Sequence, residues 1–142
     1  MIIRGVDHVG IAVRSIEAVA AVLGKTVGLG LVATETIESQ HARAAFLEAG
    51  ETDLELLEST AIDGTIAKFI ERKGEGLHHI ALEVDDLAAA LAEAKANGAV
   101  LIDEVPRKGA RGRNVAFLHP KSTGGILIEL VENPRLANQK QD

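Results

Sequence analysis

The sequence predicts an α+β fold: two tandem βαβββ modules that form one pseudo-symmetric, strongly curved mixed sheet. Three observations indicate this class. The chain contains an internal repeat, short β-branched segments alternate with amphipathic helical segments, and 142 residues suit one domain made of two half-size modules. Hydrophobic residues make up 46% and charged residues 25%, which is ordinary for a folded globular protein.

The repeat becomes visible when residues 7–16 are written above residues 78–87, because their apolar positions coincide without a gap. Residues 53–57 likewise match 127–131. The second pair of segments is about three residues further apart than the first, which places an insertion in the loop 120–124. Neither copy is long enough to close a core alone, so the two copies are expected to share one sheet.

The boundaries of the elements follow from β-branched runs, capping residues and glycines. Helices are predicted over 16–23 (after an N-cap at Ser15 and ended by Gly24), 65–73 (ended by Gly74), and 87 to about 97 (capped by Asp86). Strands are predicted at 6–13, 29–35, 42–47, 53–57, 77–84, 100–104, 114–118 and 125–131. The chain is therefore interpreted as a single domain, 1–142, with module one at about 1–60, a bridge at about 61–75, module two at about 76–133, and a polar tail, 134–142, that is expected to fray.

Composition excludes several classes of function. The chain has no Tyr and no Cys, which removes a tyrosine acid or base, a thiolate nucleophile and any disulfide. A net charge of −6 argues against a general electrostatic affinity for nucleic acid. The first residues lack the features of a secretion signal, and no run of roughly twenty apolar residues suggests a membrane span. We expect a cytoplasmic protein.

Four side chains stand at equivalent places in the two copies. His8 and His79 lie in the first strand of each module, and Glu55 and Glu129 lie in the last. Two imidazoles and two carboxylates can hold a divalent metal such as Co, Ni, Mn, Fe or Zn. Taken singly, each His also fits a hydrogen-bonded core residue, and each Glu fits a solvent-facing position on an alternating strand. Their equivalence in the repeat favours a shared metal site around which the sheet curves.

The other candidates carry less information. His78 is expected to face away from His79 and to be structural, His41 to be exposed, and His119 to shape the loop that follows it. The basic segment 107–113 fits either a solvated hairpin or a loop whose cations and amides bind an anionic substrate.

The motifs resemble a known superfamily. Residues 7–13, Asp-His-Val-Gly-Ile-Ala-Val, resemble the opening strand of the vicinal-oxygen-chelate (glyoxalase/bleomycin resistance/dioxygenase) proteins. Residues 74–81 and 117–130 resemble the signatures of its methylmalonyl-CoA epimerase branch, and the likeness extends from about residue 6 to about residue 132.

The resemblance implies metal ligands at His8, Glu55, His79 and Glu129, a divalent metal (cobalt first, with nickel, manganese or zinc possible) and a homodimer. It implies epimerisation of (R)- and (S)-methylmalonyl-CoA, by removal of the α-proton through a metal-stabilised enolate. Glu129 is the first candidate for the catalytic base and Glu55 the second. Arg107 and Lys121 are the expected substrate-binding residues.

The sequence departs from part of the family at Ala44, where some epimerases carry a second catalytic glutamate. Glu55, Glu48 or a bound water remain open as its substitute. Two alternative functions also remain open. One is another enzyme of the superfamily, a glyoxalase-type isomerase or a dioxygenase; the other is a binding protein without activity.

Overall fold

The computed structural model describes residues 1–133, so the expectation of a frayed tail at 134–142 lies outside the described residues. Its contacts divide into two compact units. The first unit is His8–His78, and the second joins Met1–Asp7 to the residues from His79 onward. Each unit contains one copy of the predicted βαβββ order, and the α+β class is thereby confirmed.

The first unit pairs its four strands in the order β2-β3-β4-β1. β1 runs parallel to β4, whereas β2, β3 and β4 are joined as antiparallel neighbours. The elements are β1 (Gly5–Ala12), α1 (Ile16–Val27), β2 (Gly30–Ile37), the 3₁₀ turn η1 (Glu38–Gln40), β3 (Ala42–Ala49), β4 (Thr52–Ser59) and α2 (Thr65–Lys73). Helix α2 begins and ends where the sequence predicted, with Gly74 after its last turn.

The first helix runs further than expected. Ser15 caps α1 as predicted, since its hydroxyl accepts a hydrogen bond from the amide of Ala18. Gly24, however, does not end the helix. The end comes at Gly28, whose φ of 72° is left-handed and whose N–H bonds to the carbonyl of Gly24. An internal glycine costs a helix only about 1 kcal/mol relative to alanine, which the packing of α1 outweighs.

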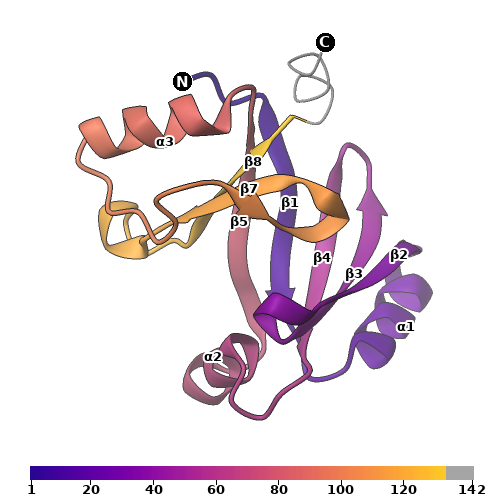
Figure 1. Ribbon diagram of the computed structural model, residues 1–142. Helices are drawn as coiled ribbons and strands as arrows, with labels where there is room; N and C mark the ends of the chain where they lie inside the picture. The colour runs from indigo at the N-terminus through magenta and orange to yellow at the C-terminus, as the bar shows by residue number, and fades with distance from the viewer. Residues whose placement is uncertain (134–142) are drawn as a thin grey trace. The chain divides into compact units, whose positions relative to one another are not determined.

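The core of the first unit lies between α1 and one face of the sheet (Figure 1). Ile16 of α1 packs with Leu47 of β3 and Leu56 of β4. Side chains of a strand alternate between its two faces. Because Leu47 and Leu56 face α1, the even-numbered residues of β3 and the odd-numbered residues of β4 face away from α1. That second face carries the candidate site.

The second unit pairs its strands in the order β5-β8-β7-β6, with β5 parallel to β8 and the others antiparallel. Its elements are β5 (Gly76–Val84), α3 (Leu87–Ala96), β6 (Arg107–Lys108), the 3₁₀ turn η2 (Ala110–Gly112), β7 (Asn114–Leu118), the 3₁₀ turn η3 (Pro120–Ser122) and β8 (Ile128–Glu132).

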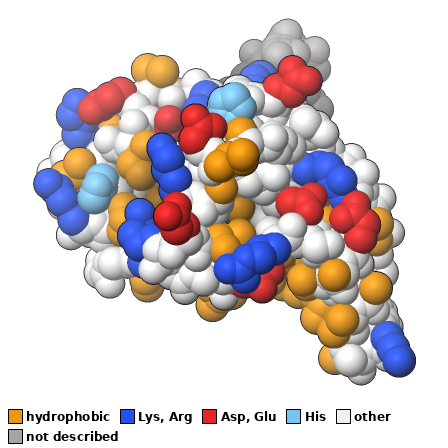
Figure 2. All heavy atoms as spheres, turned by 90° about the horizontal axis from the view of Figure 1, so that it is seen from below, with side chains coloured by type: hydrophobic (Ala, Val, Ile, Leu, Met, Phe, Trp, Pro, Cys, Tyr) orange, Lys and Arg blue, Asp and Glu red, His pale blue; other side chains and the backbone are white. Residues whose placement is uncertain are grey.

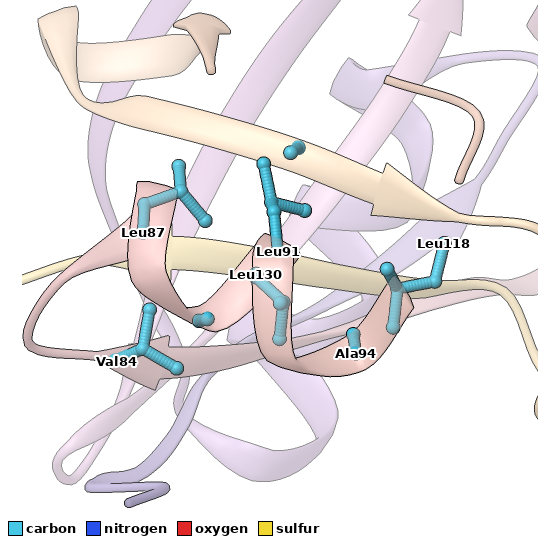
Figure 3. Packing of buried hydrophobic residues seen from close by; sticks show 8 residues of the cluster. Val84, Leu87, Leu91, Ala94, Leu118 and Leu130 are labelled. Atoms are coloured by element: carbon cyan, nitrogen blue, oxygen red, sulfur yellow. The ribbon is translucent and has the colours of Figure 1, made fainter. Parts of the chain in front are cut away.

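Helix α3 packs on this second set of strands as α1 packs on the first. Asp86 caps it by accepting a hydrogen bond from the amide of Ala89. Figure 3 shows Leu87 and Leu91 of the helix together with Leu130 of β8 in one buried cluster. The two units therefore repeat the same layering of a capped helix on a mixed sheet.

The prediction of a strand at 100–104 is wrong. Leu101 forms only an isolated bridge with Leu118, and the strand of this position in the repeat is the two-residue β6. Backbone hydrogen bonds join residues 100–103 to residues 117–119, but they form no continuous ladder. The amide of Phe117 instead donates to a carboxylate oxygen of Asp103 at 2.8 Å. The last strand also begins later than the predicted residue 125, because Gly124 and Gly125 adopt left-handed φ of 71° and 87°.

Two surface properties of residues 1–133 complete the description. No helix there combines the length and apolar character that a membrane crossing needs. On the face in Figure 2, basic side chains lie beside acidic ones. Among the ion pairs of the first unit are Arg14 with Glu75 and Arg43 with Glu58.

Candidate functional site

Four polar or charged side chains are buried among residues 1–133, and they are the four predicted ligands. His8, Glu55, His79 and Glu129 are 4–6% exposed. Burying an ionisable side chain is costly unless a partner or a cation compensates for the lost hydration. These residues therefore have the burial expected of a functional site rather than of a solvent-facing strand.

In the first unit the site is built by the parallel pair β1 and β4. Their register sets Gly10 opposite Glu55, and His8 precedes Gly10 by two residues, so the imidazole and the carboxylate project from the same face. The Nε2 of His8 lies 3.7 Å from Oε1 of Glu55. Gly10 between them has no side chain to fill the space.

The second unit repeats this geometry. In the parallel pair β5 and β8, Ala81 stands opposite Glu129, and His79 precedes Ala81 by two residues. The Nε2 of His79 lies 2.9 Å from Oε2 of Glu129. The sequence repeat thus extends to the register of the strands and to the small residue beside each carboxylate.

Sequence reasoning missed two further members of the site, Phe46 and Phe117. In each unit the phenylalanine stands opposite the glutamate on the antiparallel neighbour, Phe46 opposite Glu55 and Phe117 opposite Glu129.

Both rings meet the histidine of their own unit edge to face, with centroids 6.4 Å apart for His8 and Phe46 and 5.4 Å apart for His79 and Phe117. The signal was present in the sequence. Two of the three phenylalanines have the same spacing as the histidines.

Each unit therefore offers one imidazole nitrogen and one carboxylate oxygen on the same face of its strands. Two donors are fewer than the three or four protein ligands that hold a divalent metal in known sites. Nitrogen and oxygen donors of this kind suit zinc and the neighbouring first-row metals. The chemistry of these donors thus fits the predicted cation.

Arg107, a predicted substrate-binding residue, lies close to the pair of the second unit. Its guanidinium carbon is 5.4 Å from the centroid of the Phe117 ring, the same ring that contacts His79. Asp103 fixes it there, because one carboxylate oxygen accepts from Nε of Arg107 at 3.1 Å and the other accepts from the amide of Phe117. The positively charged guanidinium of Arg107 is thereby positioned beside the His79–Glu129 pair.

Lys121, the other predicted substrate-binding residue, lies in the exposed turn η3. In the rest of the basic segment, the exposed Lys108 donates to the carbonyl of Gly112 within the segment, and Arg113 pairs with Asp7 at 2.5 Å. The solvated-hairpin interpretation therefore fits Lys108 and the exposed Arg111 better than it fits Arg113.

The three remaining histidines behave as the sequence indicated. The ring of His78 packs on Phe69 with centroids 4.8 Å apart. His41 is exposed. The Nδ1 of His119 accepts the amide of Lys121, which shapes the turn after β7.

Ala44 occupies a fully buried position on the site face of β3, opposite Leu57 of β4. A methyl group cannot carry a proton. Glu48, one of its three expected substitutes, is exposed at the end of the same strand.

Comparison with known proteins agrees with this geometry. The family model of the glyoxalase/bleomycin resistance protein/dioxygenase superfamily matches residues 7–117. The chain belongs to this superfamily of proteins.

Three relatives narrow the class. The chain is 41% identical to the uncharacterized protein YqjC of Bacillus subtilis, over 89% of this chain and 90% of that protein. It is 39% identical to the ethylmalonyl-CoA/methylmalonyl-CoA epimerase of Cereibacter sphaeroides, over 87% of this chain and 94% of that one. A solved structure of a methylmalonyl-CoA epimerase in complex with methylmalonyl-CoA and NH4+ has a TM-score of 0.91 and 34% identity, over 95% of this chain and 98% of that one.

Within the superfamily, the chain belongs to the methylmalonyl-CoA epimerase family. Membership of that family makes it an enzyme of the isomerase class.

The buried pair of the second unit yields a test on the metal-free protein. Replacing Glu129 by Ala leaves His79 buried without its 2.9 Å partner. We expect the free energy of unfolding to fall by about 3 kcal/mol. Urea unfolding in the presence of a chelator measures this. The control is Glu51→Ala in the exposed turn before β4, which should change stability by less than about 0.5 kcal/mol. Equal effects of the two substitutions would show that the pair does not stabilise the fold.

Proposed function

We propose that this chain epimerises methylmalonyl-CoA and that its two His–Glu pairs together hold one divalent metal. The observation that carries the proposal is the duplicated buried pair: His8 with Glu55 in one unit and His79 with Glu129 in the other. The relatives whose names specify this substrate, one of them solved with it bound, support the choice of reaction.

The chemistry follows from the acidity of the substrate. The α-carbon of methylmalonyl-CoA lies between a thioester and a carboxylate. When a base removes its proton, the electron pair of the C–H bond moves toward the thioester oxygen and an enolate forms. A divalent metal bound by the two pairs would supply positive charge where that oxygen becomes anionic.

The protein's own residues then have separate tasks. Glu129 is proposed to take the α-proton, since a carboxylate on an apolar, buried face is held away from bulk water. A proton delivered to the opposite face of the enolate inverts the centre. The rings of Phe46 and Phe117 cover the histidines and limit the access of water.

The substrate is large and anionic, and this gives Arg107 its proposed task. Asp103 and the Phe117 ring hold its guanidinium beside the second unit's pair, where it can bind a carboxylate or phosphate oxygen of the substrate. Lys121 is proposed to contact a more distant anionic group, because its turn is exposed.

Solvent exchange tests the proposed reaction. In deuterium oxide the protein should place deuterium at the α-carbon of methylmalonyl-CoA and interconvert the two enantiomers. Added cobalt should raise the rate in protein stripped of metal, and nickel, manganese and zinc serve as comparisons. Mass spectrometry and chiral analysis measure both processes.

Glu129→Gln tests the role of the base, because it keeps the size of the side chain and removes the carboxylate. It should lower the rate by about 10²–10⁴-fold. Turnover of a hemithioacetal or cleavage of a catechol ring, with no exchange into methylmalonyl-CoA, would instead assign another reaction of the superfamily. Absence of all three would favour a binding protein.

Cobalt as the resident metal, a homodimer and a cytoplasmic location complete the proposal. They follow from the resemblance and from the composition. A homodimer should sediment at twice the 14.9 kDa of one chain, and the metal should co-purify with it and be identified by elemental analysis. Sedimentation at 14.9 kDa across micromolar concentrations would contradict the dimer.

A further inference from the structure

Inversion of a carbon centre needs two proton-carrying groups, one on each side of the enolate. The proposed function supplies one, Glu129, from the second unit. The chain has no tyrosine or cysteine to act as the other. Besides a bound water, the candidates for the second group are the carboxylates on the site face of the first unit.

The register of the first unit defines that face. Phe46 of β3 stands opposite Glu55, and the next position on the same face of β3 is Ala44. The neighbour of Ala44 on the edge strand β2 is Glu35. Because directly opposite residues of an antiparallel pair project to the same side, Glu35 lies on the face of Glu55 and immediately beside the methyl group of Ala44.

The burial of β2 supports this orientation. Six of its eight residues are exposed, and Glu35 is one of the two that are partly buried. Leu31 and Val32 of the same strand are 53% and 56% exposed. A glutamate more buried than its apolar strand neighbours is the reverse of the usual preference, which indicates that the carboxylate is directed to the site face by the fold.

Glu55, the second catalytic candidate from the sequence, lies on the same face but is paired with His8 at 3.7 Å as a proposed metal ligand. The other carboxylates of the first unit fit less well than Glu35. Glu48 shares the face but is exposed. Asp53 stands opposite His8, next to the proposed ligands and in the row of the sheet furthest from Ala44. Its place suits contact with the imidazole rather than with a substrate carbon.

We propose that Glu35 is the second catalytic acid and base of the epimerisation, opposite in action to Glu129. For one enantiomer, Glu129 removes the α-proton and the protonated carboxyl of Glu35 donates its proton to the other face of the enolate. For the other enantiomer the roles are exchanged. This rests on the proposed function and assigns a residue within it.

The test is Glu35→Gln in the full-length, metal-loaded protein. Epimerisation should fall by about 10²–10⁴-fold, as for loss of a general acid or base. In deuterium oxide the variant should still exchange the α-proton of the one enantiomer that Glu129 can reach, with retention of configuration. The other enantiomer should remain unlabelled. A merely structural role of Glu35 would not separate the two enantiomers.

Two further variants sharpen the result. Glu38→Gln, an exposed carboxylate three residues along the chain, should epimerise at the wild-type rate. Introducing Ala44→Glu into the Glu35→Gln protein should restore at least part of the epimerisation, because the new carboxylate projects from the adjacent position on the same face.

The outcomes are distinguishable. If the wild-type protein neither exchanges nor inverts methylmalonyl-CoA, the proposed function fails, and the role of Glu35 fails with it. If the wild-type protein is active and Glu35→Gln epimerises within threefold of it, the role of Glu35 alone is overturned. Equal loss of exchange from both enantiomers, with folding and metal content unchanged, would also overturn it.

Discussion

The burial of a glutamate beside a histidine, between two parallel strands, is the constraint on which the rest of this structure depends. A carboxylate at 4% or 6% exposure inside an apolar strand is unfavourable by itself. In each unit the strand register compensates by placing an imidazole nitrogen within 4 Å of it. The fold therefore maintains polar groups where an ordinary core would contain leucine.

In the proposed function, duplication turns this local arrangement into a metal site. A single βαβββ module offers one nitrogen and one oxygen, and the repeat doubles the set without any new type of residue. The phenylalanines are duplicated in the same way, since each stands opposite the glutamate of its unit and contacts the histidine of its unit edge to face. The departures from symmetry are where specificity can arise. Arg107 has its place only in the second unit, and Glu35 only in the first.

Much of this arrangement could be predicted from the sequence, because the four buried polar residues lie at repeat-equivalent positions and strand periodicity assigns each to a face. Helix α2 and the helix caps at Ser15 and Asp86 could also be predicted, because each depends on residues close together in the sequence. The strand at 100–104 could not be excluded in this way. Its pattern is strand-like and its backbone does bond to residues 117–119, but the pairing stays an isolated bridge, with the amide of Phe117 bonded to the side chain of Asp103.

The phenylalanines that were missed share the spacing of the histidines, but their contact with the site follows only from the strand register. The proposed role of Glu35 likewise depends on the long-range pairing of β2 with β3.

The central claim is that one metal ion is held jointly by both His–Glu pairs, and X-ray absorption of the cobalt-loaded protein tests it most directly. We predict one cobalt per chain, coordinated by two imidazoles with oxygen donors. His8→Ala and His79→Ala should each remove one imidazole from the spectrum, and His78→Ala should remove none. Two independent cobalt sites per chain, or a spectrum that His8→Ala leaves unchanged, would contradict the account.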